Sequence, residues 1–320
     1  MSDLAEPPPL NPAQQEVQDS LGAKPHERPT FRDDLGQHLR HEMEEAIGPM
    51  LSDDLDGPLF VSKRDLATLH NCQARYLAEK EEEFAWTVPT ARGTVAHKAI
   101  ELLVSWQGDP NPLDLVDAAM ARIEAEEWGA GPFLSSLDPA ERAELTGRAN
   151  DFVAAFLDTF PPLNRRWRPV AEARVRAEIC EDMVTLNGRV DLSLGRTEGN
   201  VAGKVLIDLK TGRSNPIHVE DLRFYALLET LRCGVPPRLL VDYYLESGEP
   251  RSEVVTEELL WSTAKRVVDG VGKLAALLAP DAGPAPTQPS RNCKWCCAVS
   301  RCDAGKHYTE GHEPDSWQWE

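Results

Sequence analysis

The sequence contains no run of about 18 apolar residues, the length that a membrane-spanning helix requires. It also lacks the basic start and apolar middle of a secretory signal, because its first residues are acidic and rich in proline. These two absences predict a cytoplasmic protein without a membrane partner. For seven cysteines in such a compartment, metal or redox chemistry is expected before disulfides.

Positive charge is scarce, since 34 Lys and Arg stand against 53 Asp and Glu, for a net charge of −19. Proteins that bind nucleic acids usually present a basic surface to the phosphates, so this balance argues at first against such a partner. The deficit is concentrated at the two ends of the chain. Residues 1–56 hold 13 acidic and four basic residues, and residues 303–320 hold five and one. A locally basic groove elsewhere is therefore compatible with the composition.

A phosphate-binding loop is missing as well. Such a loop ends in Gly-Lys-Ser or Gly-Lys-Thr, but the Gly-Lys pairs that begin at Gly203, Gly272 and Gly305 continue with Val, Leu and His. The chain is therefore not expected to be an ATPase.

What the sequence does have is a change of pattern near residue 165. Helical spacing predominates before it, and segments rich in Val, Ile and Leu at strand spacing follow. We expect helices at 62–80, 93–106, 112–128, 138–160, 217–232 and 256–279, and strands at 170–179, 183–194, 204–210 and 239–245.

This pattern predicts five consecutive regions. They are an acidic, Pro-rich N-terminal region, largely disordered or exposed and helical, at 1–56; a helical region with Cys72 and His97 at 57–165; a strand-rich core at 166–279; a linker and cysteine cluster at 280–302; and an acidic tail at 303–320.

Two of the predicted strands carry residues that indicate metal chemistry. Asp191 lies in the second strand, while Asp208 and Lys210 lie on the third, two residues apart and hence on one face. If the two strands pair, both carboxylates can meet at one Mg²⁺ or Mn²⁺. Lys210 can then orient or help to deprotonate a metal-bound water and offset the charge of a phosphate. His97 could add a nitrogen ligand, which favours Mn²⁺.

Each of these residues also has a simpler explanation. An Asp-x-Lys after an apolar strand is common, Asp191 could be a turn acid, and a lone His near a helix start is more often a cap or a core residue than a ligand. Their joint order and placement favour a catalytic site.

The motifs resemble the RecB-like branch of the PD-(D/E)xK nuclease superfamily, and especially its iron–sulfur members, the AddB-type subunits and CRISPR-associated RecB-like exonucleases. Gly93 to His97 is similar to the family's Gly-x-x-x-His, Gly188 to Asp191 to its Gly-x-(Ile/Val)-Asp, and Asp208 to Lys210 to its (Asp/Glu)-x-Lys. The resemblance runs from about Phe60 to Cys302.

The resemblance implies a mixed α/β fold with a restriction-endonuclease-like core. In such a core a mixed central sheet is flanked by helices, here joined to an N-terminal helical region and a C-terminal metal-cluster knot. It also implies that His97, Asp191, Asp208 and the Leu209 carbonyl bind Mg²⁺ or Mn²⁺, and that Lys210 is catalytic together with the two aspartates.

The family's next helix carries Gln-x-x-x-Tyr, a pair that contacts DNA or orders the active site. Tyr225 matches the tyrosine, but Asp221 replaces the glutamine, and Arg223 could partly substitute for it as a DNA contact. Glu172 begins the first strand, where some members have an acid, and is taken as a supporting residue.

The cysteines near the C-terminus follow the spacing C-x2-C-x5-C at Cys293, Cys296 and Cys302, and Cys72 lies far ahead of them. Four thiolates suit either an iron–sulfur cluster or Zn²⁺. By the resemblance they hold a structural [4Fe–4S] cluster that pins the C-terminal tail to the N-terminal helices, with Zn²⁺ as the alternative. Cys297 lies where relatives usually have proline and could compete as a ligand.

The function implied is a metal-dependent DNA nuclease, an exonuclease on single-stranded DNA or duplex ends, in DNA repair, recombination or CRISPR-type processing. A helicase or another repair or CRISPR protein is the candidate partner. The alternative is a catalytically silent DNA-binding or scaffolding module of a repair complex. Such modules usually lose the lysine or an aspartate first, and here Asp191, Asp208 and Lys210 are all present.

Overall fold

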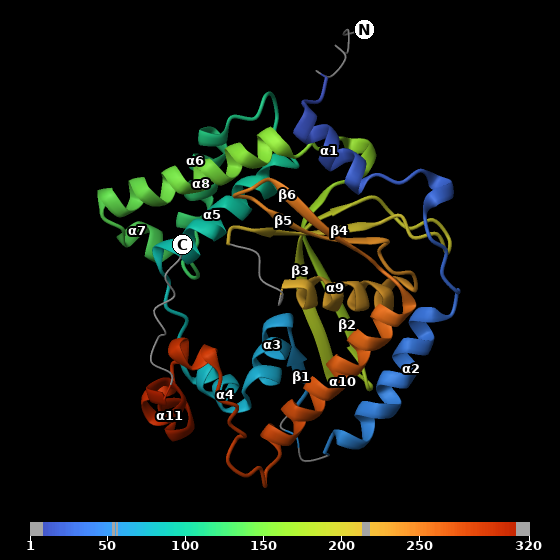
Figure 1. Cartoon of the computed structure of the whole chain (residues 1–320), viewed down its shortest axis with the longest axis vertical. Helices are drawn as coiled ribbons and strands as arrows, with labels where there is room; N and C mark the ends of the chain where they lie inside the picture. The colour runs from blue at the N-terminus through green and yellow to red at the C-terminus, as the bar shows by residue number, and fades with distance from the viewer. Residues whose placement is uncertain (1–8, 53–54, 56, 213–217, 312–320) are drawn as a thin grey trace. The chain divides into compact units, whose positions relative to one another are not determined.

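A computed structural model describes residues 9–52, 55, 57–212 and 218–311 (Figure 1). Its contacts divide the chain into two compact units. Unit 1 consists of residues 1–37, 86–175 and 189–260, and unit 2 of residues 38–85, 176–188 and 261–320. Each unit is thus assembled from segments that are distant in sequence, which differs from the five consecutive regions expected above.

The described helices and strands follow the predicted order closely. The helices are α1 (Pro12–Leu21), α2 (Leu35–Ile47), α3 (Lys63–Asn71), α4 (Gln73–Glu81), α5 (Val88–Leu103), α6 (Pro112–Glu124), α7 (Gly131–Ser136), α8 (Pro139–Thr159), α9 (His218–Cys233), α10 (Glu257–Leu278) and α11 (Asp303–Gly311). The strands are β1 (Leu59–Val61), β2 (Val170–Ile179), β3 (Val184–Leu194), β4 (Val205–Lys210), β5 (Leu239–Tyr244) and β6 (Glu249–Val254).

The four predicted strands are confirmed as β2, β3, β4 and β5, and two further strands were missed. β1 has only three residues, and β6 is largely exposed, so neither carries a buried apolar run that sequence patterns can detect.

The sheet is mixed. β3 pairs with β4 antiparallel, β4 with β5 parallel, and β5 with β6 antiparallel, while β1 joins β3 parallel and β2 also pairs with β3. Together with the surrounding helices this confirms the predicted mixed α/β fold.

In unit 1 the two faces of the sheet meet different helices. Val205, Ile207 and Leu209 alternate along β4 and pack in one core with residues of α1, α5 and α8. The residues between them, Asp208 included, leave the opposite face, where α9 contacts β4 and β5. A second core cluster lies among α5, α6 and α8. β4 is therefore packed between α9 on one face and the helices of the core cluster on the other.

The N-terminal region is more ordered and more buried than its composition suggests. Val17 and Leu21 of α1 belong to the core that contains Phe156, and along α2 the side chains of Leu39 and Met43 are buried. The expectation of disorder is therefore wrong for α1, while the helix expected in this region is present as α2, with one face buried rather than fully exposed. The proline at position 12 occupies the first turn of α1, where proline is well tolerated, rather than breaking structure. Residues 1–8 of the predicted region, and residues 312–320 of the predicted acidic tail, lie outside the described residues.

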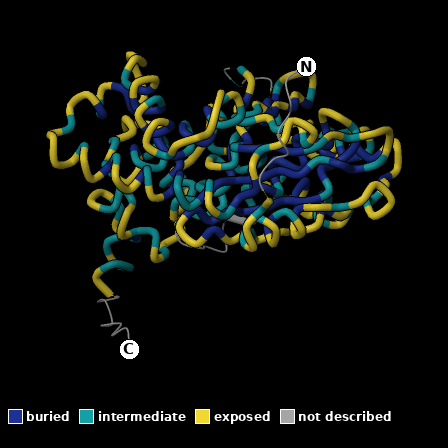
Figure 2. The backbone as a smooth tube through the Cα atoms, turned by 90° about the horizontal axis from the view of Figure 1, so that it is seen from above, coloured by how far each residue is buried: buried dark blue, intermediate teal, exposed yellow. Residues whose placement is uncertain are grey.

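Buried residues gather along the central strands and the inner faces of the helices, and exposed residues predominate in the connecting loops (Figure 2). None of the described helices combines the length and the apolar character needed to cross a membrane.

Candidate active site and cysteine cluster

Three aspartates lie in a row across β3, β4 and β5. The antiparallel register between β3 and β4 ends at the pair Leu192–Ile207, and Asp191 and Asp208 are the next residues beyond that pair on their strands. Asp191 still reaches β4, because its Oδ2 accepts the Leu209 N–H. On the other side of β4, Asp208 is the direct partner of Asp242 on β5. Asp208 and Asp242 are only 4% and 5% exposed, so their charges need close compensation. The sheet thus brings the two predicted aspartates together and adds one that the motifs did not reveal.

Lys210 supplies positive charge to this row. Its Nζ lies 2.6 Å from Asp208 Oδ2, 3.5 Å from Asp221 Oδ2 and 3.8 Å from Asp242 Oδ1. Asp221, which stands where the resemblance expects glutamine, therefore faces the predicted catalytic lysine from α9. Three carboxylates hold the ammonium group in a defined position at the end of β4.

His97 reaches the same region from α5. Its Nδ1 lies 3.5 Å from Asp191 Oδ1. Gly93, one turn earlier, lets the helix approach the end of β4, because a Cβ at this position would lie 3.2 Å from Thr211 Oγ1. Burial opposes a charge on His97, but the carboxylates, Asp191 foremost, outweigh it and raise the pKa of His97 above its usual value.

Glu172 completes a compact group with these two side chains. One donor atom each from His97, Glu172 and Asp191 all lie within 4.8 Å of one another, which is close enough for a single metal ion. The backbone at Glu172 is left-handed, with φ of 52°, an uncommon conformation for a residue with a side chain and one that often marks functional sites. Arg189 Nε lies 2.5 Å from its Oε2. Burial raises the pKa of Glu172, with Arg189 opposing this shift.

The predicted ligands are therefore near one another but are not all in one group. Asp191 is in the three-donor group, whereas Asp208 faces Lys210 instead. The Leu209 N–H donates to Asp191 Oδ2 at 2.7 Å. Because the N–H and C=O of a strand residue point towards the same neighbouring strand, the Leu209 carbonyl also lies on the Asp191 side of β4. Nitrogen, carboxylate and carbonyl ligands suit Mn²⁺ or Mg²⁺.

Two further predicted residues have structural partners. Tyr225 is 3% exposed within α9. Arg223 donates to both carboxylate oxygens of Glu253 on β6 and to Glu220 at 2.9 Å. These placements fit a supporting role for both residues better than direct contact with DNA.

The match to known families agrees with this geometry. Residues 61–303, about three quarters of the chain, match the family model described as the PD-(D/E)XK nuclease superfamily. The chain belongs to this superfamily. No curated protein matches the chain in sequence.

Two solved structures are similar to this PD-(D/E)XK protein at low identity. The protein SSO0001 is 14% identical with a TM-score of 0.36, and the alignment covers 84% of this chain and 96% of that one. A candidate exonuclease from Eubacterium rectale is 11% identical with a TM-score of 0.46, covering 78% of this chain and 87% of that one.

Unit 2 of the PD-(D/E)XK protein contains the predicted cysteine group. Cys72, Cys293, Cys296 and Cys302 all line one small cavity of about 40 Å³. Backbone N–H groups point at two of the sulfurs, from Ser290 to Cys293 Sγ at 3.4 Å and from Gly305 to Cys302 Sγ at 3.3 Å. Four sulfur ligands around one cavity are a donor set that fits a metal centre.

Cys72 owes its position to a break between two helices. One helix was expected from 62 to 80, but the chain forms α3 and α4, separated at Cys72, whose φ of −165° and ψ of 115° are extended. The single-helix prediction is therefore wrong at this residue. Propensity does not reveal the break, because Cys72 is followed at once by a second helix-forming segment.

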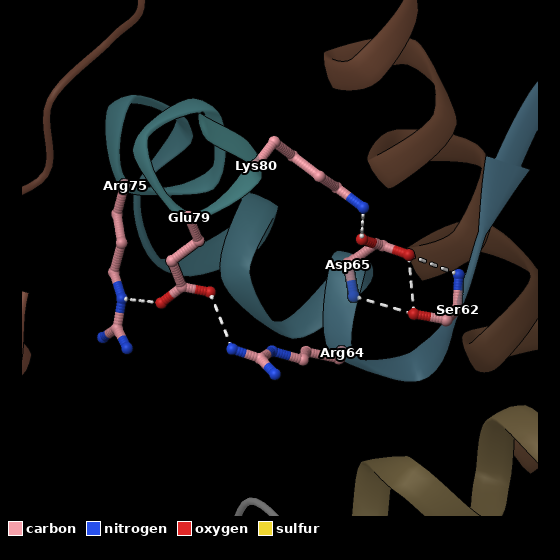
Figure 3. A network of polar contacts seen from close by, with 6 residues as sticks. All are labelled: Ser62, Arg64, Asp65, Arg75, Glu79 and Lys80. Atoms are coloured by element: carbon pink, nitrogen blue, oxygen red, sulfur yellow. Dashed lines mark hydrogen bonds and ion pairs between the residues drawn. The ribbon is translucent and has the colours of Figure 1, made fainter. Parts of the chain in front are cut away.

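Polar contacts fix α3 and α4 around this break (Figure 3). Asp65 accepts from the backbone and hydroxyl of Ser62 at the start of α3 and receives Lys80 Nζ from α4 at 2.9 Å. Burial alone would raise the pKa of Asp65, but the contacts with Ser62 and Lys80 outweigh it and lower the pKa. Glu79 of α4 also forms ion pairs with Arg64 of α3 and with Arg75 of α4. The helix pair therefore presents Cys72 in a fixed place.

Proposed function

We propose that the protein is a metal-dependent DNA nuclease that acts as an exonuclease on single-stranded DNA or duplex ends. Support comes mainly from the group formed by His97, Glu172 and Asp191, which adjoins the buried Lys210–Asp208 pair on paired strands. Partly buried carboxylates gathered this closely favour a bound cation, and membership in the superfamily makes a divalent metal ion the natural one.

In this proposal His97, Glu172 and Asp191 hold Mg²⁺ or Mn²⁺ together with the Leu209 carbonyl, and Asp208 remains a predicted ligand beside them. A bound divalent cation supplies Lewis acidity and a more acidic water. Lys210 orients the attacking water and offers positive charge where phosphate charge develops.

The carboxylates around Lys210 have a separate task. Asp208, Asp221 and Asp242 hold its ammonium group in place before substrate arrives, so that little reorganisation is needed during the reaction. In this role Asp242 is a positioning residue.

We further propose that the four cysteines hold a structural [4Fe–4S] cluster. Their convergence on one cavity and the N–H contacts to sulfur support a metal centre, and the family resemblance favours iron–sulfur over Zn²⁺. Thiolate ligands fit a reducing compartment, so we place the protein in the cytoplasm. A helicase or CRISPR partner and a role in DNA repair stay predictions of the resemblance.

The proposal is tested by incubating end-labelled single- and double-stranded DNA with anaerobically purified protein in Mn²⁺, Mg²⁺ or EDTA. The Lys210→Ala variant is compared with Lys265→Ala, which removes an exposed lysine from α10. We expect metal-dependent cleavage by the wild type and by Lys265→Ala, and none by Lys210→Ala.

Product lengths separate exonuclease from endonuclease action, because an exonuclease releases short products from the labelled end at the earliest times. If the wild type binds DNA but cleaves neither substrate in any metal, the nuclease proposal fails. The silent DNA-binding module is then the better description.

A further inference from the structure

A second cavity, of about 530 Å³, lies in unit 1 apart from the proposed catalytic residues. Leu194 and Val205, which are partners across β3 and β4, line it. Asp208 lies three residues further along β4, roughly 10 Å away at the usual rise of a strand. The volume is within the range of about 300–1,000 Å³ that is typical of small-molecule sites.

The lining of this cavity is basic, although the whole chain is strongly acidic. Lys24, Arg28, Arg166 and Arg238 line it, against Asp19 and Glu27. Glu27 accepts the Lys24 N–H at 2.8 Å and lies within ion-pair distance of His26 and of Lys24 itself, so it offsets the charge of Lys24 but not that of the three arginines. The cavity therefore carries an excess of positive charge.

Arg28 and Arg238 are the two lining residues whose guanidinium groups most favour a bound anion. The Nε atoms of both are buried, and neither has a hydrogen-bond acceptor within the described part of the chain. A buried charged donor without an acceptor is unfavourable. Burial lowers the pKa of Arg238, and the charge of Arg28 lowers it further, as expected for two neighbouring groups of like charge. An anion between them would relieve both effects.

The backbone around these two arginines is closely packed. A Cβ on Gly203 would clash with the Arg196 carbonyl and would lie 3.2 Å from Arg28 Nη1, and Gly195 has φ of +81°. Arg238 is held on both sides, its N–H donating to the Lys204 carbonyl at 2.8 Å and its carbonyl accepting from Val255 at 3.2 Å. The two guanidinium groups therefore project from fixed segments.

The rest of the wall is apolar and aromatic. Phe160, Pro161 and the half-buried Trp167 line it beside the arginines. Guanidinium groups bind phosphate through paired hydrogen bonds, and aromatic rings provide stacking surfaces for bases. A cationic wall next to an aromatic one matches the two halves of a nucleotide.

We propose that this cavity binds a nucleoside phosphate, with Arg28 and Arg238 on the phosphate and Trp167 against the base. The ligand is either a free nucleotide or the phosphorylated terminal nucleotide of a DNA strand, because both present the same chemical groups. The site is separate from the proposed nuclease centre and does not depend on catalysis.

The test is isothermal titration of the full chain in EDTA, in the wild type and in an Asp191→Asn background, so that cleavage plays no part. The probes are deoxyadenosine 5′-monophosphate, deoxyadenosine, and one oligonucleotide with and without a 5′-phosphate. We expect the phosphorylated member of at least one pair to bind about tenfold more tightly or better. Binding of the mononucleotide identifies a free nucleotide, and binding of the phosphorylated oligonucleotide alone identifies a strand end.

Arg28→Gln and Arg238→Gln should each weaken this binding at least about tenfold. The matched control is Arg122→Gln, which removes the same charge from an exposed position on α6 and should change nothing. Since Arg238 also donates to the Leu21 carbonyl, melting curves are recorded and Arg238→Lys serves as a charge-retaining variant. The proposal is overturned if no phosphate-dependent binding is found, or if Arg28→Gln binds as well as Arg122→Gln. Either result leaves the nuclease proposal untouched.

Discussion

Lys210 combines a proposed catalytic role with a structural one. Its side chain is 11% exposed and lies among the carboxylates of Asp208, Asp221 and Asp242. From the sequence, a lysine acting on water would be expected to be replaceable without harm to folding. Its surroundings indicate otherwise, because removing one partner from a buried ion-pair group leaves uncompensated charge.

Lys210→Ala should therefore lose both activity and stability. We expect cleavage to fall at least about 100-fold, in line with the loss of a transition-state charge contact. Unfolding in urea should show a decrease in the free energy of unfolding of about 3 kcal/mol, the lower end for breaking a buried ion pair.

The double variant Lys210→Ala/Asp242→Asn separates the two roles. The Asp242→Asn change removes one of the repelling charges, so stability should return in part while cleavage stays absent. If Lys210→Ala alone melts like the wild type, the carboxylates do not depend on this lysine and its structural role is refuted.

Glu172 gives a second prediction at the residue scale. Because its carboxylate lies in one group with His97 and Asp191, Glu172→Gln should weaken Mn²⁺ binding by roughly 10- to 100-fold, as is typical when a residue that supports a metal site is lost. Calorimetric titration with Mn²⁺ measures this. Glu101→Gln is the control, since Glu101 is a nearby carboxylate paired with Lys98 and outside the group. Equal affinities in the two variants would exclude Glu172 as a ligand.

The sequence motifs led to Asp191, Asp208, Lys210 and His97, and the family resemblance added Glu172 as a supporting residue, but nothing in the sequence pointed to Asp242. The positions of Glu172 and Asp242 in the site depend on information that single-sequence patterns do not hold. Glu172 enters the group through a left-handed backbone within β2, and Asp242 through the parallel register of β4 and β5. Local patterns reveal what lies on one element, whereas pairing between distant strands is set by the packed sheet.

At the scale of elements, α9 is tied to the start of β4 by a buried carboxylate. Glu229 of α9 is 2% exposed and receives Lys204 Nζ and, at 2.8 Å, Arg232 Nη2. Burial alone would raise the pKa of Glu229, but the hydrogen bonds from Lys204 and Arg232 outweigh it and lower the pKa. This contact fixes the C-terminal end of α9 to the start of β4, whereas Asp221 lies near the N-terminal end of the helix.

A lowered folded-state pKa determines the pH dependence. The stability that Glu229 contributes is present above its unfolded pKa, near 4.3, and is lost as the pH falls through its lower folded pKa. Glu229→Gln should therefore lower the free energy of unfolding by about 3 kcal/mol at pH 7 and show a smaller further loss between pH 5 and 3. Urea unfolding at each pH measures both, beside Glu144→Gln, an exposed control on α8. If Glu229→Gln loses as much unfolding free energy between pH 5 and 3 as the wild type does, Glu229 does not contribute to the pH dependence of stability.

Strands with apolar alternation could be located from the sequence to within a residue, as β2 and β3 show. The elements that were missed are those that fold only through contacts with residues far away in the sequence. α1 forms because Val17 and Leu21 pack on α8 and the sheet, and because Asn11 and Gln14 donate to the carbonyls of Asp158 and Leu157. None of these contacts is visible in an acidic, proline-rich segment by itself.

For the whole molecule, order in the N-terminal region changes what its acidic charge can be expected to do. A freely moving acidic tail could repel DNA from a surface that it covers, but residues 12–21 are part of the core of unit 1. Removing residues 1–30 should therefore unfold or strongly destabilise the protein rather than release an inhibited site. The acidic residues of α1 and α2 are solvated for the most part, since Glu16, Asp19, Glu42 and Glu45 are exposed and only Glu44 is half-buried.

We expect the proposed cysteine centre to contribute to the stability of unit 2 as a whole. It joins the α3–α4 pair to the segment before α11, so the loss of one ligand should release a connection between residues more than 200 positions apart. Cys302→Ala should lower both the iron content and the melting temperature before it changes the chemistry of cleavage, because a site with four ligands and no open position is structural. Iron and zinc analysis with thermal melting of anaerobic protein measures this.

Cys297→Ala is the matched control, because it removes a neighbouring thiol that is exposed and does not line the cavity. Burial, together with Glu82 and Cys296, raises the pKa of Cys297, which disfavours the thiolate form needed for a ligand. We expect this variant to keep its iron and its melting temperature. Zinc in place of iron in the wild type would leave the four-thiolate centre in place but overturn the iron–sulfur assignment. Full iron content and unchanged melting in Cys302→Ala would show that the four cysteines do not form one metal site.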